Sequence, residues 1–191
     1  NMLTGLAVMA ALPSPPVVIA NHPSRSATAY GEYGADDPAE FRRWNDTAPN
    51  VAVGMAGAPG HQAIALAGEA IKKVFATSKT PLNLSRGVYL GYPTLGGFDQ
   101  MTARVGGFWD SMLGEGRRWW ITSNSDFHRH YSDEGVDFYP GEYSKTFVWA
   151  EKNHDAILAA LRSGQVFVTT GDLVSEAYVT IRYKKAEASI G

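Results

Sequence analysis

The spacing of apolar and polar positions along the chain predicts helices and strands in alternation. Met2–Leu12 is rich in helix-forming residues, and the prolines at 13, 15 and 16 cannot continue a helix, so a buried helix is predicted to end before them. The short apolar run Val17–Ala20 comes next and predicts a buried strand, which Asn21 ends.

Turn residues and helix caps place the next elements. Gly31–Gly34 is predicted to be a turn. Asp36 or Asp37, followed by Pro38, is predicted to begin a helix that carries Phe41 and Trp44 on one side. Two further segments follow, a short strand and then a glycine-rich loop: Val51–Val53 and Gly54–Gly60.

Apolar residues at helical intervals predict two helices in the centre of the chain. They span His61–Ala76 and Gly97–Leu113, the second despite Gly106 and Gly107. The segment between these helices is mostly predicted loop, with one possible strand at Val88–Leu90. A strand at Arg118–Thr122 and an ordered, aromatic-rich loop at Phe127–Tyr143 are predicted after them.

The last part of the chain returns to the same alternation. A strand is predicted at Lys145–Ala150, followed by a helix that Asn153 caps and Gly164 ends. Two more strands are predicted at Gln165–Thr170 and Ala177–Tyr183. This order of strands and helices predicts an α/β fold, built either on a mainly parallel sheet or on an incomplete barrel.

Composition and charge narrow the class of protein. A chain of 191 residues with 45% hydrophobic residues fits one folded domain, with room for an appendage, and argues against disorder. With a net charge of -2, the chain lacks the excess of basic residues that is typical of nucleic-acid-binding proteins. The apolar segment near the start is too short to span a membrane. We therefore expect a soluble protein of the cytoplasm or periplasm. The absence of cysteine leaves histidine, aspartate and glutamate as metal ligands.

Two histidine-containing segments each follow an apolar run. His22 lies in VVIANHP, and Asp126 and His128 lie in WWITSNSDFHRH, where His130 continues the alternation. If both runs are parallel strands, these residues follow the carboxyl ends of the strands, where α/β folds gather functional side chains. An extended backbone would point Asp126, His128 and His130 the same way. This pattern predicts a site for Zn, Mn or Fe.

Each of these residues also has a structural interpretation. His22 can cap its strand through backbone hydrogen bonds, and Asp126 can cap a loop and bind the neighbouring histidine. His61, at the predicted start of a helix after a glycine-rich loop, is either near an anion site or part of a tight turn. Arg25 and Arg129 flank the two segments and are candidates for binding an anionic substrate.

The order N-H-P, then a long α/β stretch, then S-N-S-D-F-H resembles the later part of the polymerase and histidinol phosphatase (PHP) family. The passage Leu161–Thr170 is similar to the L-R-x-G-x-x-F-V-T segment of the carbaryl-hydrolase-like branch. The resemblance covers about Val17–Thr170. It implies a distorted (β/α)7 barrel, here incomplete, and a metal-dependent phosphoesterase in which His22, Asp126 and His128 are metal ligands and Asp126 and His128 are catalytic.

The chain departs from this family in one important respect. The opening H-x-D-x-H motif, which supplies much of the family's metal site, is absent, and no carboxylate stands near Met55. We expect the missing ligands to lie before Asn1, the alternative being a degenerate site. The expected domains are residues 1–172, as the later part of a PHP-like hydrolase, and residues 173–191, as the start of a β-rich appendage.

The expected function is hydrolysis of a small phosphoester, or less strongly of a carbamate or amide ester, by metal-activated water. The alternative is a non-catalytic α/β module that binds a partner or a sugar through a degenerate site. The loss of H-x-D-x-H and the aromatic loop Phe138–Tyr143 favour this alternative modestly. The sequence does not indicate an oligomeric state.

Overall fold

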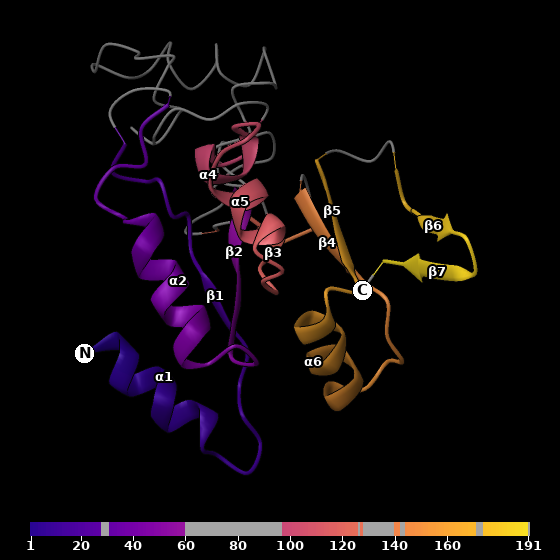
Figure 1. Cartoon of the computed structure of the whole chain (residues 1–191), viewed down its shortest axis with the longest axis horizontal. Coiled ribbons are helices and arrows are strands. Elements are labelled where there is room, and N and C mark those ends of the chain that lie inside the picture. The colour runs from indigo at the N-terminus through magenta and orange to yellow at the C-terminus, as the bar shows by residue number, and fades with distance from the viewer. Residues whose placement is uncertain are drawn as a thin grey trace.

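The computed structural model describes residues 1–27, 31–59, 97–125, 127, 140–141, 144–170 and 174–190. Within these residues it contains five helices and seven strands (Figure 1). The strands form one parallel sheet and two antiparallel pairs. The incomplete barrel stays a prediction, because helices and strands in this order also occur in other α/β folds.

A three-stranded parallel sheet lies at the centre of the described chain. Its strands are β1 (Val18–Ala20), β2 (Ala52–Pro59) and β3 (Trp120–Asn124), and β2 lies between the other two. Every residue of β2 is buried. Because all three strands run in the same direction, their carboxyl ends lie at one edge of the sheet. We call this edge the carboxyl edge.

One face of the sheet packs against helices and forms the hydrophobic core. The helices are α1 (Met2–Ala10), α2 (Pro38–Thr47), α4 (Gln100–Ala103) and α5 (Phe108–Gly114). Phe41 of α2 lies 5.6 Å from Trp119 and 5.8 Å from Phe108, measured between ring centroids. Other buried residues of this core are Leu6, Ala20, Val51, Met55, Met101 and Met112. In Figure 1, α1 and α2 lie together beside β1.

Local signals in the sequence set the bounds of two helices. Asp37 caps α2, accepting a hydrogen bond from Ala39 N at 2.8 Å, and Pro38 occupies the first turn. Asn153 caps α6 (His154–Ser163) in the same way, and Gly164 ends it with a left-handed backbone, at φ +82°. The predictions of both helices are therefore confirmed, as is a helix after Asn1. The predicted burial of that first helix is wrong: Leu6 is the only buried residue of α1, because only one side of the helix packs against the core.

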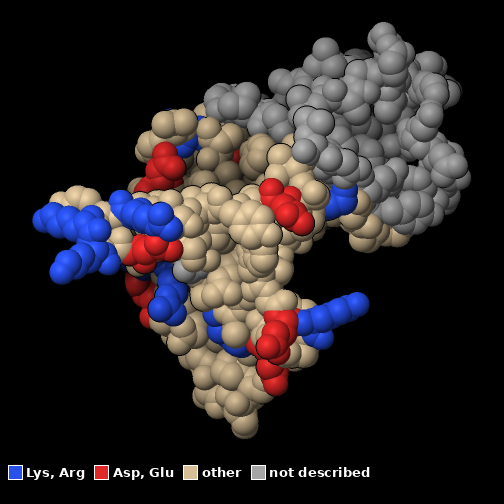
Figure 2. All heavy atoms as spheres, turned by 90° about the vertical axis from the view of Figure 1, so that its right-hand side faces the viewer, with Lys and Arg blue, Asp and Glu red and all other residues tan. Residues whose placement is uncertain are grey.

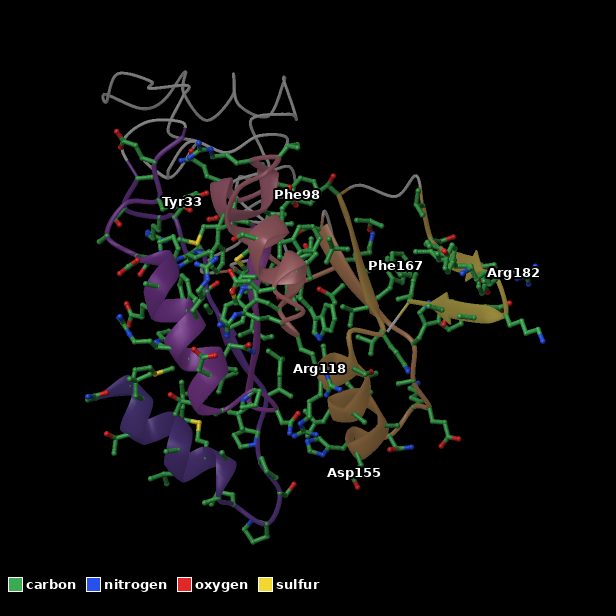
Figure 3. All side chains as sticks on the ribbon, in the orientation of Figure 1. Tyr33, Phe98, Arg118, Asp155, Phe167 and Arg182 are labelled. Carbon is green, nitrogen blue, oxygen red and sulfur yellow. The ribbon has the colours of Figure 1, made fainter. Side chains whose placement is uncertain are left out.

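The second half of the chain contributes two antiparallel strand pairs. β4 (Ser144–Val148) pairs with β5 (Val166–Thr170), and the rings of Phe147 and Phe167 stack at 4.7 Å. β6 (Thr180–Tyr183) and β7 (Ala186–Ser189) form a hairpin whose residues are all exposed. This hairpin lies to one side of the other elements, and Arg182 projects outward from it (Figures 1 and 3).

Two predictions about where helices, strands and loops lie were wrong. The first concerns Gly54–Gly60, predicted as a loop, whose residues as far as Pro59 belong to β2. Glycine, alanine and proline disfavour a strand locally, but the close packing of β2 requires small residues. A Cβ atom added to Gly54 would lie 2.2 Å from the carbonyl oxygen of Trp120, and one added to Gly57 would lie 2.5 Å from Thr102 Oγ1.

The predicted single helix at Gly97–Leu113 is interrupted. α4 ends at Ala103, and α5 begins at Phe108. Between them Gly106 has φ +72°, and Val105, which the periodicity assigned to the apolar face, is 98% exposed. β5 runs antiparallel to β4 although a helix connects the two strands.

Other predictions lie outside the described residues. They are the helix His61–Ala76, the strand Val88–Leu90, most of the loop Phe127–Tyr143 and the turn after Thr170. In the described part of the chain, no helix is both long and apolar enough to cross a membrane. On the face in Figure 2, the described acidic and basic side chains lie in small groups separated by uncharged ones.

A cluster of ion pairs connects α2 with the end of α5. Glu115 accepts hydrogen bonds from Arg42 Nη2 and Arg117 Nε, each at 2.6 Å. These two bonds, that of Arg42 first, lower the pKa of Glu115 from 4.5 to about 2. Arg117 also pairs with Asp46 at 2.5 Å.

This cluster predicts an acid-dependent loss of stability. Because the pKa of Glu115 is lower in the folded protein, its contribution is fully present above pH 4.5 and is lost as the pH falls towards about 2. Glu115→Gln should therefore lower the free energy of unfolding slightly at neutral pH and not at pH 2. Urea unfolding of both proteins across this range measures the difference. A difference that is independent of pH would contradict the prediction.

Candidate functional site

The segments that follow β1 and β3 leave the sheet at the carboxyl edge. Asn21 and His22 come directly after β1, and β3 ends at Asn124. Although 103 positions separate Asn21 from Asn124, Asn124 Nδ2 donates a hydrogen bond to Asn21 Oδ1 at 3.4 Å. The chain segment that carries N-H-P and the chain segment that begins S-N-S-D-F-H therefore meet at one edge of the sheet.

A cavity of about 350 Å³ lies at this contact, on the face of the sheet opposite the helical core. It is lined by Ile19 of β1 and Asn21 directly after it, by Ala56 of β2, and by Thr122 and Asn124 of β3. Ala56 is small, so it leaves space between the two outer strands. The Oδ1 atom of Asn124 is buried and has no hydrogen-bond partner within the described residues. The cavity therefore presents amide and hydroxyl groups to a ligand.

Side chains of β4 hold the end of β3 in place. Thr146 Oγ1 accepts a hydrogen bond from Ser123 N and donates one to Ser123 O, both at 2.8 Å. Ser144 Oγ donates to Asn124 O at 3.0 Å. These bonds satisfy backbone groups at the edge of β3 and fix the backbone from which Asn124 extends.

His22 has a strained backbone. Its φ angle is +28°, in the left-handed region that residues other than glycine rarely adopt. Such a conformation costs on the order of 1–3 kcal/mol and persists where surrounding contacts hold it. Here Arg25 N donates to His22 O at 3.0 Å, and the following Pro23 is buried. The His22 side chain is itself half-buried.

Asp99 is a site residue that sequence reasoning missed. It is fully buried and accepts hydrogen bonds from Ser24, two residues after His22, through both the backbone nitrogen at 3.0 Å and the hydroxyl at 2.8 Å. Asp99 also caps α4 through Met101 N. Its position directly before a helical apolar pattern is a capping signal, but no local pattern indicates its bond to Ser24.

Several carboxyl groups lie near the loop that carries His22. The pKa of Asp36 is raised, first by burial and then by the nearby carboxylates of Glu40 and Asp99, while His22 acts in the opposite direction. His22, Asp36 and Asp99 thus lie close enough to interact electrostatically. Among the residues that the structure describes, no three His, Asp or Glu side chains form a group that could hold a metal ion.

The remaining predicted site residues divide into two groups. Arg25 is exposed and lies in the turn after His22, at the carboxyl edge. The others lie outside the described residues: His61, Asp126, His128, Arg129 and His130. Phe127, which stands between the two predicted ligands of the second segment, is described and donates its backbone N–H to Ser125 Oγ at 3.2 Å.

Comparison with protein-family models, curated proteins and solved structures finds no match for this chain.

Proposed function

We propose that this chain is a metal-dependent hydrolase that cleaves phosphoesters with metal-activated water. The observation that carries the proposal is the hydrogen bond between Asn21 and Asn124. Each asparagine stands one or two positions before a predicted ligand, His22 in the first case and Asp126 in the second. A contact between the two segments is what a shared metal site requires. A structural role for two unrelated capping residues does not require it.

The composition of the edge is compatible with a metal. Imidazole and carboxylate ligands suit first-row divalent ions, and the half-buried His22 directly follows Asn21, which lines the cavity. In the proposal His22, Asp126 and His128 hold Zn, Mn or Fe. When bound, such an ion lowers the pKa of water from 15.7 to roughly 7, which supplies hydroxide at neutral pH.

The other proposed roles belong to groups of the chain itself. Asp126 would hold the metal together with His22 and His128, or would accept the proton of the attacking water. Arg25 and Arg129 bind the anionic phosphoester, and His61 contributes to the same anion site. Arg25 is exposed and lies in the turn that follows His22, at this edge of the sheet.

Elemental analysis of the purified chain, together with His22→Gly, tests the proposal. Glycine tolerates the positive φ at position 22, so the variant should keep its melting temperature within a few degrees while it loses the imidazole. We expect its affinity for Zn or Mn to fall by at least about 100-fold. This is a larger loss of affinity than is typical when a residue that only orients a metal ligand is replaced. Hydrolysis of a nitrophenyl phosphodiester should fall with it.

His154→Ala is the matched control. It also removes one imidazole, but this side chain is 80% exposed at the start of α6. The control should bind metal and hydrolyse the phosphodiester like the wild type. A wild-type protein without stoichiometric metal would contradict the proposal and favour a non-catalytic binding module at the same cavity.

A further inference from the structure

Asp99 connects three parts of the fold at the carboxyl edge. Its carboxylate binds the loop after β1 through Ser24 N and Ser24 Oγ, at 3.0 Å and 2.8 Å. The same side chain accepts from Met101 N in α4 at 2.8 Å. Its backbone N–H donates to the carbonyl oxygen of Gly57, in β2, at 2.8 Å. Both Asp99 and Ser24 are fully buried.

Helix capping alone does not explain this arrangement. A cap of α4 needs one carboxylate oxygen, and Oδ1 meets that need through Met101 N. The bonds from Ser24 use Oδ2 as well as Oδ1, so the carboxylate also fixes a loop 75 positions away in the sequence. A carboxylate without exposure to water is costly unless hydrogen bonds compensate it, and bonds to a charged acceptor are stronger than neutral ones.

The bonds to Ser24 act on a loop with a strained residue. His22, two positions earlier, has φ +28°, and its carbonyl oxygen accepts from Arg25 N across Ser24. Ser24 O in turn accepts from Ala27 N at 2.9 Å. Ser24 therefore connects this turn to Asp99. Asp99 is itself hydrogen-bonded to the central strand β2.

We propose that Asp99 is a positioning residue that holds the His22 loop in its strained conformation, so that the imidazole is placed for metal binding before the metal arrives. This inference rests on the proposed function. It adds a residue outside both predicted motifs, which acts through Ser24 and not by touching the ion. Residues that orient a metal ligand typically contribute 10–100-fold to metal affinity.

The test compares Asp99→Asn and Ser24→Ala with Asn45→Ala. The first variant keeps the shape of the side chain and removes one acceptor, and the second keeps the Ser24 N–H and removes only its hydroxyl. Asn45 is a buried amide at the opposite, amino-terminal edge of the sheet, where it donates to Ala52 O and Arg118 O at 3.0 Å and 3.1 Å. Its loss should destabilise the fold without touching the His22 loop.

Two measurements report on the His22 loop independently of catalytic turnover. Titration with Co²⁺ alone, read by visible absorption, should show roughly 10- to 100-fold weaker binding in Asp99→Asn. A smaller loss is expected in Ser24→Ala, and none in Asn45→Ala despite its lower melting temperature. In the metal-free proteins, the Ser24 amide should be protected from hydrogen exchange in the wild type and should lose that protection in Asp99→Asn.

The outcomes separate this inference from the proposed function. If the wild type binds Co²⁺ and His22→Gly does not, but Asp99→Asn and Ser24→Ala bind as tightly as the wild type, the positioning role is overturned and the metal site stands. If Asn45→Ala weakens Co²⁺ binding as much as the two loop variants, stability alone explains the effect and the inference fails. If the wild type binds no Co²⁺, both proposals fail. Should Asp99→Asn not fold, Ser24→Ala decides the question.

Discussion

Replacement of Asp126 by asparagine is expected to lower metal-dependent hydrolysis roughly a thousand-fold with little change in stability. In the proposed site this carboxylate is both a metal ligand and an acceptor for the proton of the attacking water. Asparagine preserves the shape but removes the charge and the basicity. Metal-assisted stabilisation of a transition state contributes several kcal/mol, and about 4 kcal/mol corresponds to a thousand-fold change in rate. The measurement is kcat/KM for a nitrophenyl phosphodiester at saturating Mn²⁺ or Zn²⁺.

Asp155→Asn is the matched control for this prediction. It makes the same chemical change at a side chain that is 95% exposed in the first turn of α6. Figure 3 shows Asp155 at the far end of the molecule from the carboxyl edge. The control should retain wild-type turnover. Equal activity of Asp126→Asn and the wild type at saturating metal would remove Asp126 from the reaction, and equal losses in both variants would indicate a general effect of charge.

The elements that the sequence predicts correctly are those whose ends are marked by capping or helix-terminating residues. Asp37 and Pro38 begin α2, and Asn153 and Gly164 bound α6, because capping and left-handed termination depend on a few neighbouring residues. The strands Val18–Ala20 and Val166–Thr170 were also predicted to within a residue at each end. In these segments local preference and tertiary environment agree.

The errors arise where tertiary packing overrides local preference. The segment Gly54–Pro59 reads as a loop, yet it is buried between β1 and β3, and only small residues fit so close to the backbone of Trp120. The periodicity over Gly97–Leu113 is genuine in two separate helices, and the turn at Gly106 between them shifts its phase, which leaves Val105 exposed. A short stretch of sequence does not indicate which strands lie beside β2. It also does not indicate that the helical periodicity shifts at Gly106.

The same distinction applies to the candidate site. That polar residues after β1 and β3 approach one another follows from the parallel direction of the strands, and the contact between Asn21 and Asn124 confirms that these two strand ends meet. The strained backbone of His22 and its link to Asp99 could not be predicted, because they depend on where α4 lies relative to the first loop. Sequence patterns identify ligand types, whereas the partners that position them come from distant segments.

Gly164→Ala is expected to cost about 3 kcal/mol of folding stability and about 10 °C in melting temperature. Gly164 has φ +82°, a conformation in which a Cβ atom is strained. That atom would also lie 2.5 to 2.7 Å from three ring atoms of Trp120. The indole cannot move freely, because its Nε1 donates to Arg162 O at 3.2 Å and its backbone belongs to β3. The substitution should therefore disturb the packing of α6 against the central sheet.

Two further glycines separate the causes of this loss. Gly116 has a similar φ of +74° with no atom within 4 Å of an added Cβ, so Gly116→Ala should show only the backbone strain, about 1 kcal/mol. Gly5 lies inside α1 with the same open space and an ordinary helical backbone, so Gly5→Ala should stabilise the protein by up to about 1 kcal/mol. Urea unfolding measures all three. Equal losses in Gly164→Ala and Gly116→Ala would mean that contact with Trp120 contributes nothing, and the close packing of α6 on β3 would then be wrong.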